Sequence, residues 1–160
     1  MPDENDLRFK PMKVQDDFVL MPDQWKVDFF QSEGELSRFF IELKENARLM
    51  GTRCPNCGSI YFWPRSWCHD CYVDCEWVEM SLKGNITVFS KVSISLSDLQ
   101  TEVPYMQGGI RLEGARYAIV NYLRGFDYEK TYNGMPVRAE FYPLEQRTGR
   151  VRDFYFVPDE

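Results

Sequence analysis

The chain has 160 residues and a formal net charge of −6, a length that suits one ordinary domain or two small ones. Its composition, 44% hydrophobic and 16% aromatic, can fill a core and excludes general disorder. The acidic charge argues against a general nucleic-acid binder, because that class of protein needs a basic face to neutralise phosphates.

The sequence holds no apolar run near the length of a membrane span. Residues 1–6 are polar and acidic, without the apolar centre of a signal peptide. We therefore expect a cytoplasmic protein that makes no membrane contact. The high aromatic content indicates more apolar surface than a small domain can hide, which favours a protein partner.

Residues 1 to about 31 are predicted to form an arm, in which charges and prolines interrupt any long element. Apolar residues nevertheless recur along it, unlike in a disordered tail; they are Phe9, Val14, Phe18, Val19, Leu20, Met21 and Trp25. These residues could pack back on the same chain or lie across a partner subunit, and the sequence favours neither. The acidic pair Asp16-Asp17 is interpreted as solvated charge.

A short amphipathic helix is predicted to follow the arm. The run Ser32-Glu33-Gly34-Glu35 has the form of a capping box, in which each outer side chain satisfies a free N–H. Apolar residues then recur at helical spacing: Leu36, Phe39, Phe40, Leu43 and Ala47. The helix is expected to end near Met50-Gly51, with the glycine as its stop.

Two Cys-x-x-Cys pairs follow, Cys54 with Cys57 and Cys68 with Cys71. Each pair can form a tight knuckle that points both sulfurs at one centre, and two knuckles supply four thiolates for a tetrahedral ion. Gly58, directly after the first knuckle, suits a position that needs positive φ. With all four positions filled by the protein, the metal would be structural and not catalytic.

The four paired cysteines could also form a site other than a zinc site. Zinc is favoured by the short spacing of the knuckles, while iron in a rubredoxin-like site stays open because four thiolates suit either metal. Disulfides are disfavoured in a cytosolic chain, and a dithiol redox centre would use one pair at a helix N-terminus. Cys75 is interpreted as a small buried apolar residue and His69 as solvent-facing.

From Leu82 the apolar period changes to two, which predicts β-strands. The first strand runs from Ile86 to Leu96 with a bulge near Phe89-Ser90. The others are expected at 106–112, 116–123, 137–144 and 151–157, with a helical turn at 127–131. Five strands interrupted between the third and fourth are typical of an OB-fold barrel.

The predicted fold is thus mainly β. Residues 1–50 form the arm and helix, 51–80 a zinc ribbon and 81–160 the OB-fold. The ribbon is too small to build a core of its own, so its folding should depend on the metal.

In their order and spacing, several segments resemble an acyl-CoA-associated family with an N-terminal helix, a rubredoxin-like zinc ribbon and an OB-fold. The segments, which extend over most of the chain, are Phe39-Phe40-Ile41-Glu42-Leu43, Arg53-Cys54-Pro55-Asn56-Cys57-Gly58, Trp63-Pro64-Arg65, Cys68-His69-Asp70-Cys71, Trp77-Val78-Glu79, Gly84-Asn85-Ile86-Thr87-Val88, Val103-Pro104-Tyr105 and Gly134-Met135-Pro136-Val137. Two features depart from the pattern: Tyr72 stands where such a ribbon often has glycine, and the arm is longer than the family core requires.

The resemblance implies a zinc-binding accessory subunit in a hetero-oligomer. Members of this family bind thiolase-like enzymes or acyl-CoA hydratases and support their assembly or activity. Among the members, the chain most resembles the small subunits of benzoylsuccinyl-CoA thiolases, which act on an aromatic acyl-CoA in a β-oxidation-like degradation. The catalytic groups of the thiolase (acyltransferase) reaction would then come from the partner.

The residues themselves show no nucleophile–base set, since the single histidine lies inside a knuckle and the paired cysteines are assigned to metal. Whether a CoA ester also contacts this chain stays open. Cations and aromatic rings that could hold one are Arg111, Arg116, Arg124, Arg147, Arg150 and Arg152, with Tyr117, Tyr122 and Phe126. Two alternatives are a module that binds single-stranded nucleic acid through stacked aromatics and a metal-dependent redox protein.

Overall fold

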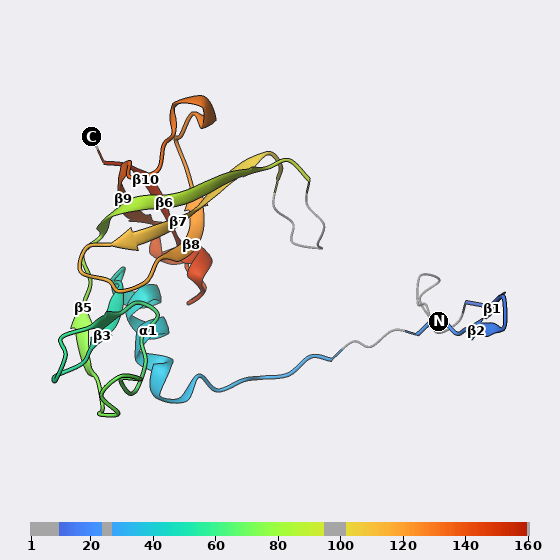
Figure 1. Cartoon of the computed structure of the whole chain (residues 1–160), viewed down its shortest axis with the longest axis horizontal. Coiled ribbons are helices and arrows are strands. Elements are labelled where there is room, and N and C mark those ends of the chain that lie inside the picture. The colour runs from blue at the N-terminus through green and yellow to red at the C-terminus, as the bar shows by residue number, and fades with distance from the viewer. Residues whose placement is uncertain (1–9, 24–26, 95–101, 160) are drawn as a thin grey trace. The chain divides into compact units, whose positions relative to one another are not determined.

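A computed structural model of the chain describes residues 10–23, 27–94 and 102–159 (Figure 1). The chain divides into two compact units, Met1–Ser32 and Glu33–Glu160. This division does not test the predicted domain boundaries at residues 50 and 80, which stay a prediction. The helix belongs to the same unit as the barrel.

The arm contains a β-hairpin that the sequence did not predict. Strands β1 (Lys13–Gln15) and β2 (Phe18–Leu20) pair antiparallel, with Val14 opposite Val19. The acidic pair Asp16-Asp17 forms the turn, where Asp16 has a φ of +51°. Apolar side chains of the hairpin are exposed, for example Val14 at 71% and Phe18 at 72%. Phe9 and Trp25 of the predicted anchors lie outside the described residues.

Helix α1 (Ser37–Asn46) is shorter than predicted and begins differently. The expected capping box does not form at its start: Gly34 has a φ of +53°, and a 3-10 turn at Gly34–Leu36 leads into the helix without a side-chain cap. The helix also ends before Gly51, because Ala47 takes the left-handed conformation at its C-cap. Phe39 and Leu43 are its buried residues, so the predicted apolar stripe does face the core.

The ribbon is a small antiparallel sheet in the order β4-β3-β5, formed by Ile60–Tyr61, Met50–Arg53 and Glu76–Glu79. Gly51 lies in β3, so its role differs from the predicted helix stop. A Cβ at this position would stand 2.6 Å from Met80 Sδ and 2.8 Å from the carbonyl oxygen of Tyr61. Glycine is therefore needed for close packing within the sheet.

The last five strands close into a barrel in the order β10-β8-β7-β6-β9, which Figure 1 shows beside the ribbon and α1. All pairings are antiparallel except that of β10 with β8. One parallel closure in an otherwise antiparallel barrel of five strands is the OB-fold arrangement, so the predicted fold class is confirmed. The strands are β6 (Lys83–Val92), β7 (Tyr105–Leu112), β8 (Ile119–Leu123), β9 (Pro136–Phe141) and β10 (Phe154–Pro158).

Several predicted strand details need correction. The register of β6 shifts between Ile86 and Val88, nearer its start than the predicted bulge at Phe89-Ser90. Val151–Asp153 forms a 3-10 turn, so the last strand begins at Phe154. The helical turn predicted at 127–131 is present as a 3-10 turn at Tyr128–Lys130.

One hydrophobic cluster joins the helix, the ribbon and the barrel. It includes Phe39 of α1, Phe62 and Met80 of the ribbon, and Ile110 and Phe156 of the barrel. The Phe39 ring meets the Phe62 and Trp63 rings edge-on, with centroids 5.8 and 5.1 Å apart. This shared core makes residues 33–160 one packed body. Within the described residues, no helix is both long and apolar enough to cross a membrane.

The loop between β9 and β10 is organised around Asp153, which is 3% exposed. Its carboxylate accepts hydrogen bonds from the backbone N–H of Thr148 at 2.8 Å, of Gly149 at 2.5 Å and of Arg150 at 3.2 Å. The Thr148 hydroxyl donates another at 3.0 Å. A buried carboxylate with so many donors fixes the loop against the barrel.

We expect Asp153→Asn to lower the free energy of unfolding by about 2 kcal/mol, because the amide group turns a donor toward backbone N–H groups that need an acceptor. Chemical denaturation measures this. The matched control is Asp127→Asn, since the Asp127 carboxylate accepts one exposed backbone hydrogen bond, from the N–H of Glu129, and forms an exposed ion pair with Lys130; it should change stability by less than about 1 kcal/mol. Equal effects of the two variants would contradict the assigned role.

Candidate metal centre

The four paired cysteines meet at one point. Ligand atoms of Cys54, Cys57, Cys68 and Cys71 all lie within 4.8 Å of one another. Across the two knuckles, Cys57 Sγ and Cys68 Sγ are 3.8 Å apart. Sulfurs at the usual zinc–sulfur distance on a tetrahedron are about 3.8 Å apart, whereas a disulfide needs about 2.05 Å. The cluster therefore fits a tetrahedral metal ion.

The two knuckles close in the same way. The N–H of Gly58 donates to the carbonyl of Cys54 at 3.0 Å, and the N–H of Tyr72 donates to that of Cys68 at 2.8 Å. Both residues are left-handed, with φ of +72° at Gly58 and +55° at Tyr72. Glycine takes this conformation freely, whereas a residue with a Cβ loses roughly 1–2 kcal/mol. The second knuckle thus closes without the glycine that such ribbons often have.

Hydrogen bonds around the sulfurs shift the pKa values of the thiols in opposite directions. The hydroxyl of the buried Tyr61 lies 3.2 Å from Cys68 Sγ. This hydrogen bond, the largest single cause, lowers the pKa of the Cys68 thiol to about 6 and raises the pKa of Tyr61 to about 12. The hydrogen bond to Cys57, followed by burial, raises the pKa of Cys71 to about 12, so the Cys71 thiol favours keeping its proton while the Cys68 thiol favours losing it. A cation among the sulfurs would remove that conflict.

The second knuckle is tied to the barrel by Arg116. Its guanidinium forms an ion pair with Asp70 and reaches the Ser59 hydroxyl at 3.3 Å. This pairing lowers the pKa of Asp70 and raises that of Arg116. Backbone contacts also connect the ribbon to the barrel unit here: Ile60 forms a β-bridge with Ala115, and the N–H of Arg116 donates to the carbonyl of Ile60 at 2.9 Å. The barrel therefore positions the knuckle.

Cys75 and His69 differ from their predicted environments. Cys75 is only partly buried, packs against the cluster of Cys54, Tyr61 and Cys68, and has a pKa raised by burial. The His69 side chain is 31% exposed and points Nε2 at Asp70 Oδ1, 3.1 Å away. His69 is thus half-buried and not simply solvent-facing, because its ring packs 5.6 Å from that of Tyr61.

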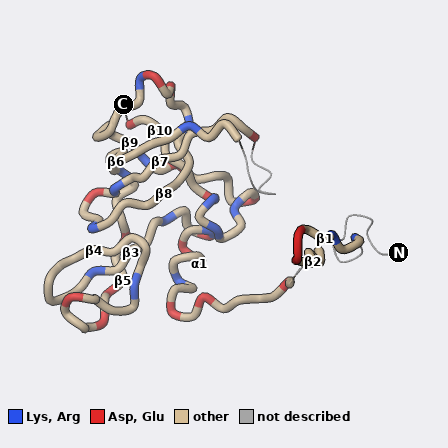
Figure 2. Tube along the Cα trace, turned by 45° about the vertical axis from the view of Figure 1, so that its right-hand side comes forward, with Lys and Arg blue, Asp and Glu red and all other residues tan. Residues whose placement is uncertain are grey.

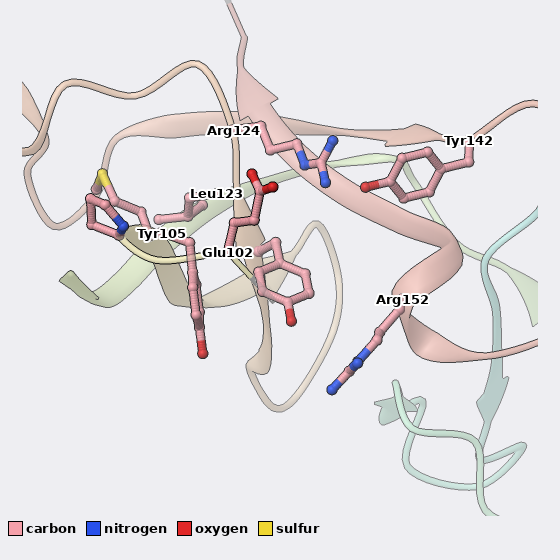
Figure 3. A pocket seen from close by; sticks show the side chains of 9 residues that line it. Glu102, Tyr105, Leu123, Arg124, Tyr142 and Arg152 are labelled. Atoms are coloured by element: carbon pink, nitrogen blue, oxygen red, sulfur yellow. The ribbon is translucent and has the colours of Figure 1, made fainter. Parts of the chain in front are cut away.

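A cavity of about 490 Å³ on the barrel brings together some of the predicted cations and aromatic rings (Figure 3). The guanidinium of Arg124 packs beside a pair of tyrosines, with Cζ 4.9 Å from the Tyr142 ring centroid and 4.6 Å from that of Tyr155. Arg152 reaches in from the other side, as Figure 3 shows. The acidic residue Glu102 also lines the cavity, so its charge partly offsets that of the two arginines. The arginines and the flat rings can still bind an anionic ligand that carries an aromatic group.

The other predicted cations are placed elsewhere. Arg116 is engaged with Asp70, and Arg147 directs Nη1 at the carbonyl of Leu43 near the end of α1, 3.5 Å away. Phe126 lines an adjoining cavity of about 510 Å³ that Arg124 also borders. Of the predicted set, only Arg124, Arg152 and Tyr122 line the first cavity.

Tyr142 lines the cavity and Tyr155 contacts Arg124 beside it, yet sequence reasoning singled out neither tyrosine. Their alternation with apolar residues along the chain resembles that of any strand, so no local signal marks them. Only the pairing of β9 with β10 brings Tyr142 and Tyr155 together, with ring centroids 5.2 Å apart.

Comparison with known proteins finds similarity to a zinc-ribbon family and to a DUF35 protein. The family described as "ChsH2, rubredoxin-like zinc ribbon domain" matches residues 44–77. A DUF35 domain-containing scaffold protein of Methanocaldococcus jannaschii is 35% identical over 112 residues, which cover 68% of this chain and 78% of that protein. The zinc-ribbon match and the four-cysteine cluster together support a structural zinc ion.

Two solved structures share the fold. One, titled as an Ltp2-ChsH2(DUF35) aldolase, has a TM-score of 0.64 at 23% identity and covers 81% of this chain and 98% of its own. The other is a DUF35 protein of unknown function from Sulfolobus solfataricus, with a TM-score of 0.56 at 21% identity, covering 79% and 87%. At these identities the similarity shows the fold alone.

Proposed function

The chain belongs to the DUF35 family, and from this premise we propose that it is a non-catalytic accessory subunit of an acyl-CoA-processing enzyme. The observation that carries the proposal is the 35% identity with a scaffold protein over 112 residues. The partner we propose is a thiolase, or in second place an acyl-CoA hydratase, in a cytoplasmic hetero-oligomer. The proposed pathway is a β-oxidation-like degradation, with an aromatic acyl-CoA as its substrate.

The proposed ligands of the structural zinc are Cys54, Cys57, Cys68 and Cys71. The 4.8 Å cluster and the 3.8 Å separation across the knuckles support this set. Zinc would neutralise the thiolates and hold the two knuckles in register, and a site with four protein ligands leaves no position for substrate.

We expect Cys54→Ala to abolish stoichiometric zinc binding and to reduce the soluble yield, because metal binding is part of the folding free energy of a small ribbon. Metal content per chain by mass spectrometry measures this, and colourless protein with one equivalent of zinc also distinguishes zinc from iron. Cys75→Ala is the control and should keep its zinc. A Cys54→Ala protein with full zinc and an unchanged unfolding transition would contradict the ligand assignment.

Exposed apolar residues support a protein partner. The arm presents Met21 at 78% exposure and Phe29 at 73%, and the ribbon presents Trp67 at 50%. Aromatic residues and methionine are enriched at protein interfaces relative to the rest of the surface.

Purification of the tagged chain from its native host tests the partnership. We expect a thiolase or acyl-CoA hydratase to co-purify, and the isolated partner to gain acyl-CoA thiolysis or hydration activity when the chain is added back. Recovery of the chain without any such enzyme, or a partner whose activity is indifferent to it, would contradict the proposed function.

We also propose that the cavity at Arg124 contributes to CoA-ester handling, since Arg124 and Arg152 suit phosphates and the tyrosines suit a flat base. Arg124→Met should weaken CoA-ester binding by the complex about tenfold, measured by calorimetry, while the methionine side chain can still pack beside the two rings. Arg138→Met, which removes the ion pair with Glu140 at 2.7 Å, is the control and should not change binding. Equal affinity in both variants would exclude this cavity.

A further inference from the structure

The second knuckle presents two aromatic rings to solvent. Trp67 and Tyr72 stack with ring centroids 5.9 Å apart and planes inclined by 19°. Trp67 is 50% exposed and Tyr72 is 79% exposed. The two rings therefore stack on each other, and at least half of each residue's surface stays accessible to solvent. Large rings held in this way are the residue types that dominate binding at protein interfaces.

Tyr72 stands in a backbone position that glycine would occupy more easily. The corresponding residue of the first knuckle is Gly58, and both have positive φ. The tyrosine ring is not buried in the core, so burial does not compensate for the strained backbone. The knuckle requires the left-handed backbone but not a tyrosine in it, and this is a reason to look for a function of the side chain.

An acidic group lies beside the aromatic pair. Asp74 is the antiparallel bridge partner of Trp67, which places the two Cβ atoms on one face about 5 Å apart. The segment 68–76 holds three acidic residues and no lysine or arginine. Asp70 is engaged with Arg116, whereas Asp74 and Glu76 have no ion pair among the described residues. Arg65 lines a pocket with Asp74, but its guanidinium lies over the Tyr61 ring, with Cζ 5.6 Å from the ring centroid. Figure 2 shows acidic positions in red on the loops beyond β3, β4 and β5.

We propose that Trp67, Tyr72 and Asp74 form a docking corner for an arginine side chain on a surface loop of the partner subunit. A planar guanidinium can stack on an indole or phenol face while it donates to a carboxylate, and it loses less hydration than an ammonium. The negative charge of the corner complements this cation. This inference rests on the proposed function, because the arginine belongs to the partner enzyme.

The corner is preorganised. Cys68 and Cys71 bracket the knuckle that separates Trp67 from Tyr72, and Asp70 within it is held to the barrel by Arg116. Little freedom is then lost when a partner side chain docks, and rigid aromatic groups give more affinity per contact for this reason.

Tyr72→Gly separates binding from folding. We expect this variant to keep its zinc and an unfolding midpoint equal to or higher than that of the wild type, because glycine relaxes the backbone. The dissociation constant of the complex with the co-purified partner should rise about tenfold. Tyr132→Ala removes another tyrosine, 57% exposed, and should leave the dissociation constant unchanged. Unchanged affinity in Tyr72→Gly, or loss of zinc or of folding, would overturn the proposal.

Asp74→Asn tests the charge of the occupant. The variant should weaken the complex severalfold and make its affinity less dependent on salt, because one ion pair is lost. If Tyr72→Gly weakens the complex while Asp74→Asn does not, the occupant is apolar and the arginine assignment is overturned.

A titration without the partner separates this inference from the proposed function. Acetyl-arginine amide at millimolar concentration should shift the indole N–H resonance of Trp67 in the full-length chain, and acetyl-citrulline amide should not. The resonance is assigned with Trp67→Phe. Absence of a shift, or equal shifts with both compounds, overturns the corner even where a partner co-purifies, whereas failure to capture a partner contradicts only the proposed function.

Discussion

The convergence of four cysteine sulfurs on one point is the constraint on which the rest of the molecule depends. The ribbon sheet has strands of four, two and four residues, and its own buried cluster consists of Cys54, Tyr61 and Cys68. A unit of this size buries too little apolar surface to hold two knuckles closed. Thiolates so close together also repel, so a bound cation would remove the repulsion and close the ribbon at the same time.

The short strand β4 connects the metal centre to the barrel. Tyr61 directs its hydroxyl at Cys68 Sγ, while its neighbour Ile60 forms the backbone bridge to Ala115. Consecutive residues in a strand point to opposite faces, so one strand can serve the metal centre and the barrel at once. With the shared core around Phe39, this fixes the knuckles and the Arg124 cavity within one packed body. A scaffold gains from such rigidity, because separate surfaces can then contact one partner in a fixed relation.

The sequence was informative where structure is local. Knuckle ligands stand three residues apart, so their spacing alone predicted that the sulfurs would meet, and alternating apolar residues predicted the strands of the barrel. Local sequence patterns do not predict structure that depends on contacts between residues far apart in the sequence. Arg116 and Asp70 are 46 residues apart, and nothing near either one identifies the other. Gly51 looked like a helix stop, whereas close packing against Met80 explains it. The capping box that the sequence predicted is absent because Gly34 has a left-handed and not a helical conformation.

The two knuckles give an internal comparison that bears on function. A Cβ at Gly58 would meet no atom within 4 Å, so that position has room for a side chain and still carries none. The second knuckle accepts a tyrosine there, although its left-handed backbone loses roughly 1–2 kcal/mol and stacking on Trp67 returns about 0.5–1.5 kcal/mol. The fold therefore gains nothing clear from Tyr72. Since the metal constrains both knuckles alike, the difference between them points to the surface of the second knuckle, where recognition of a partner would act.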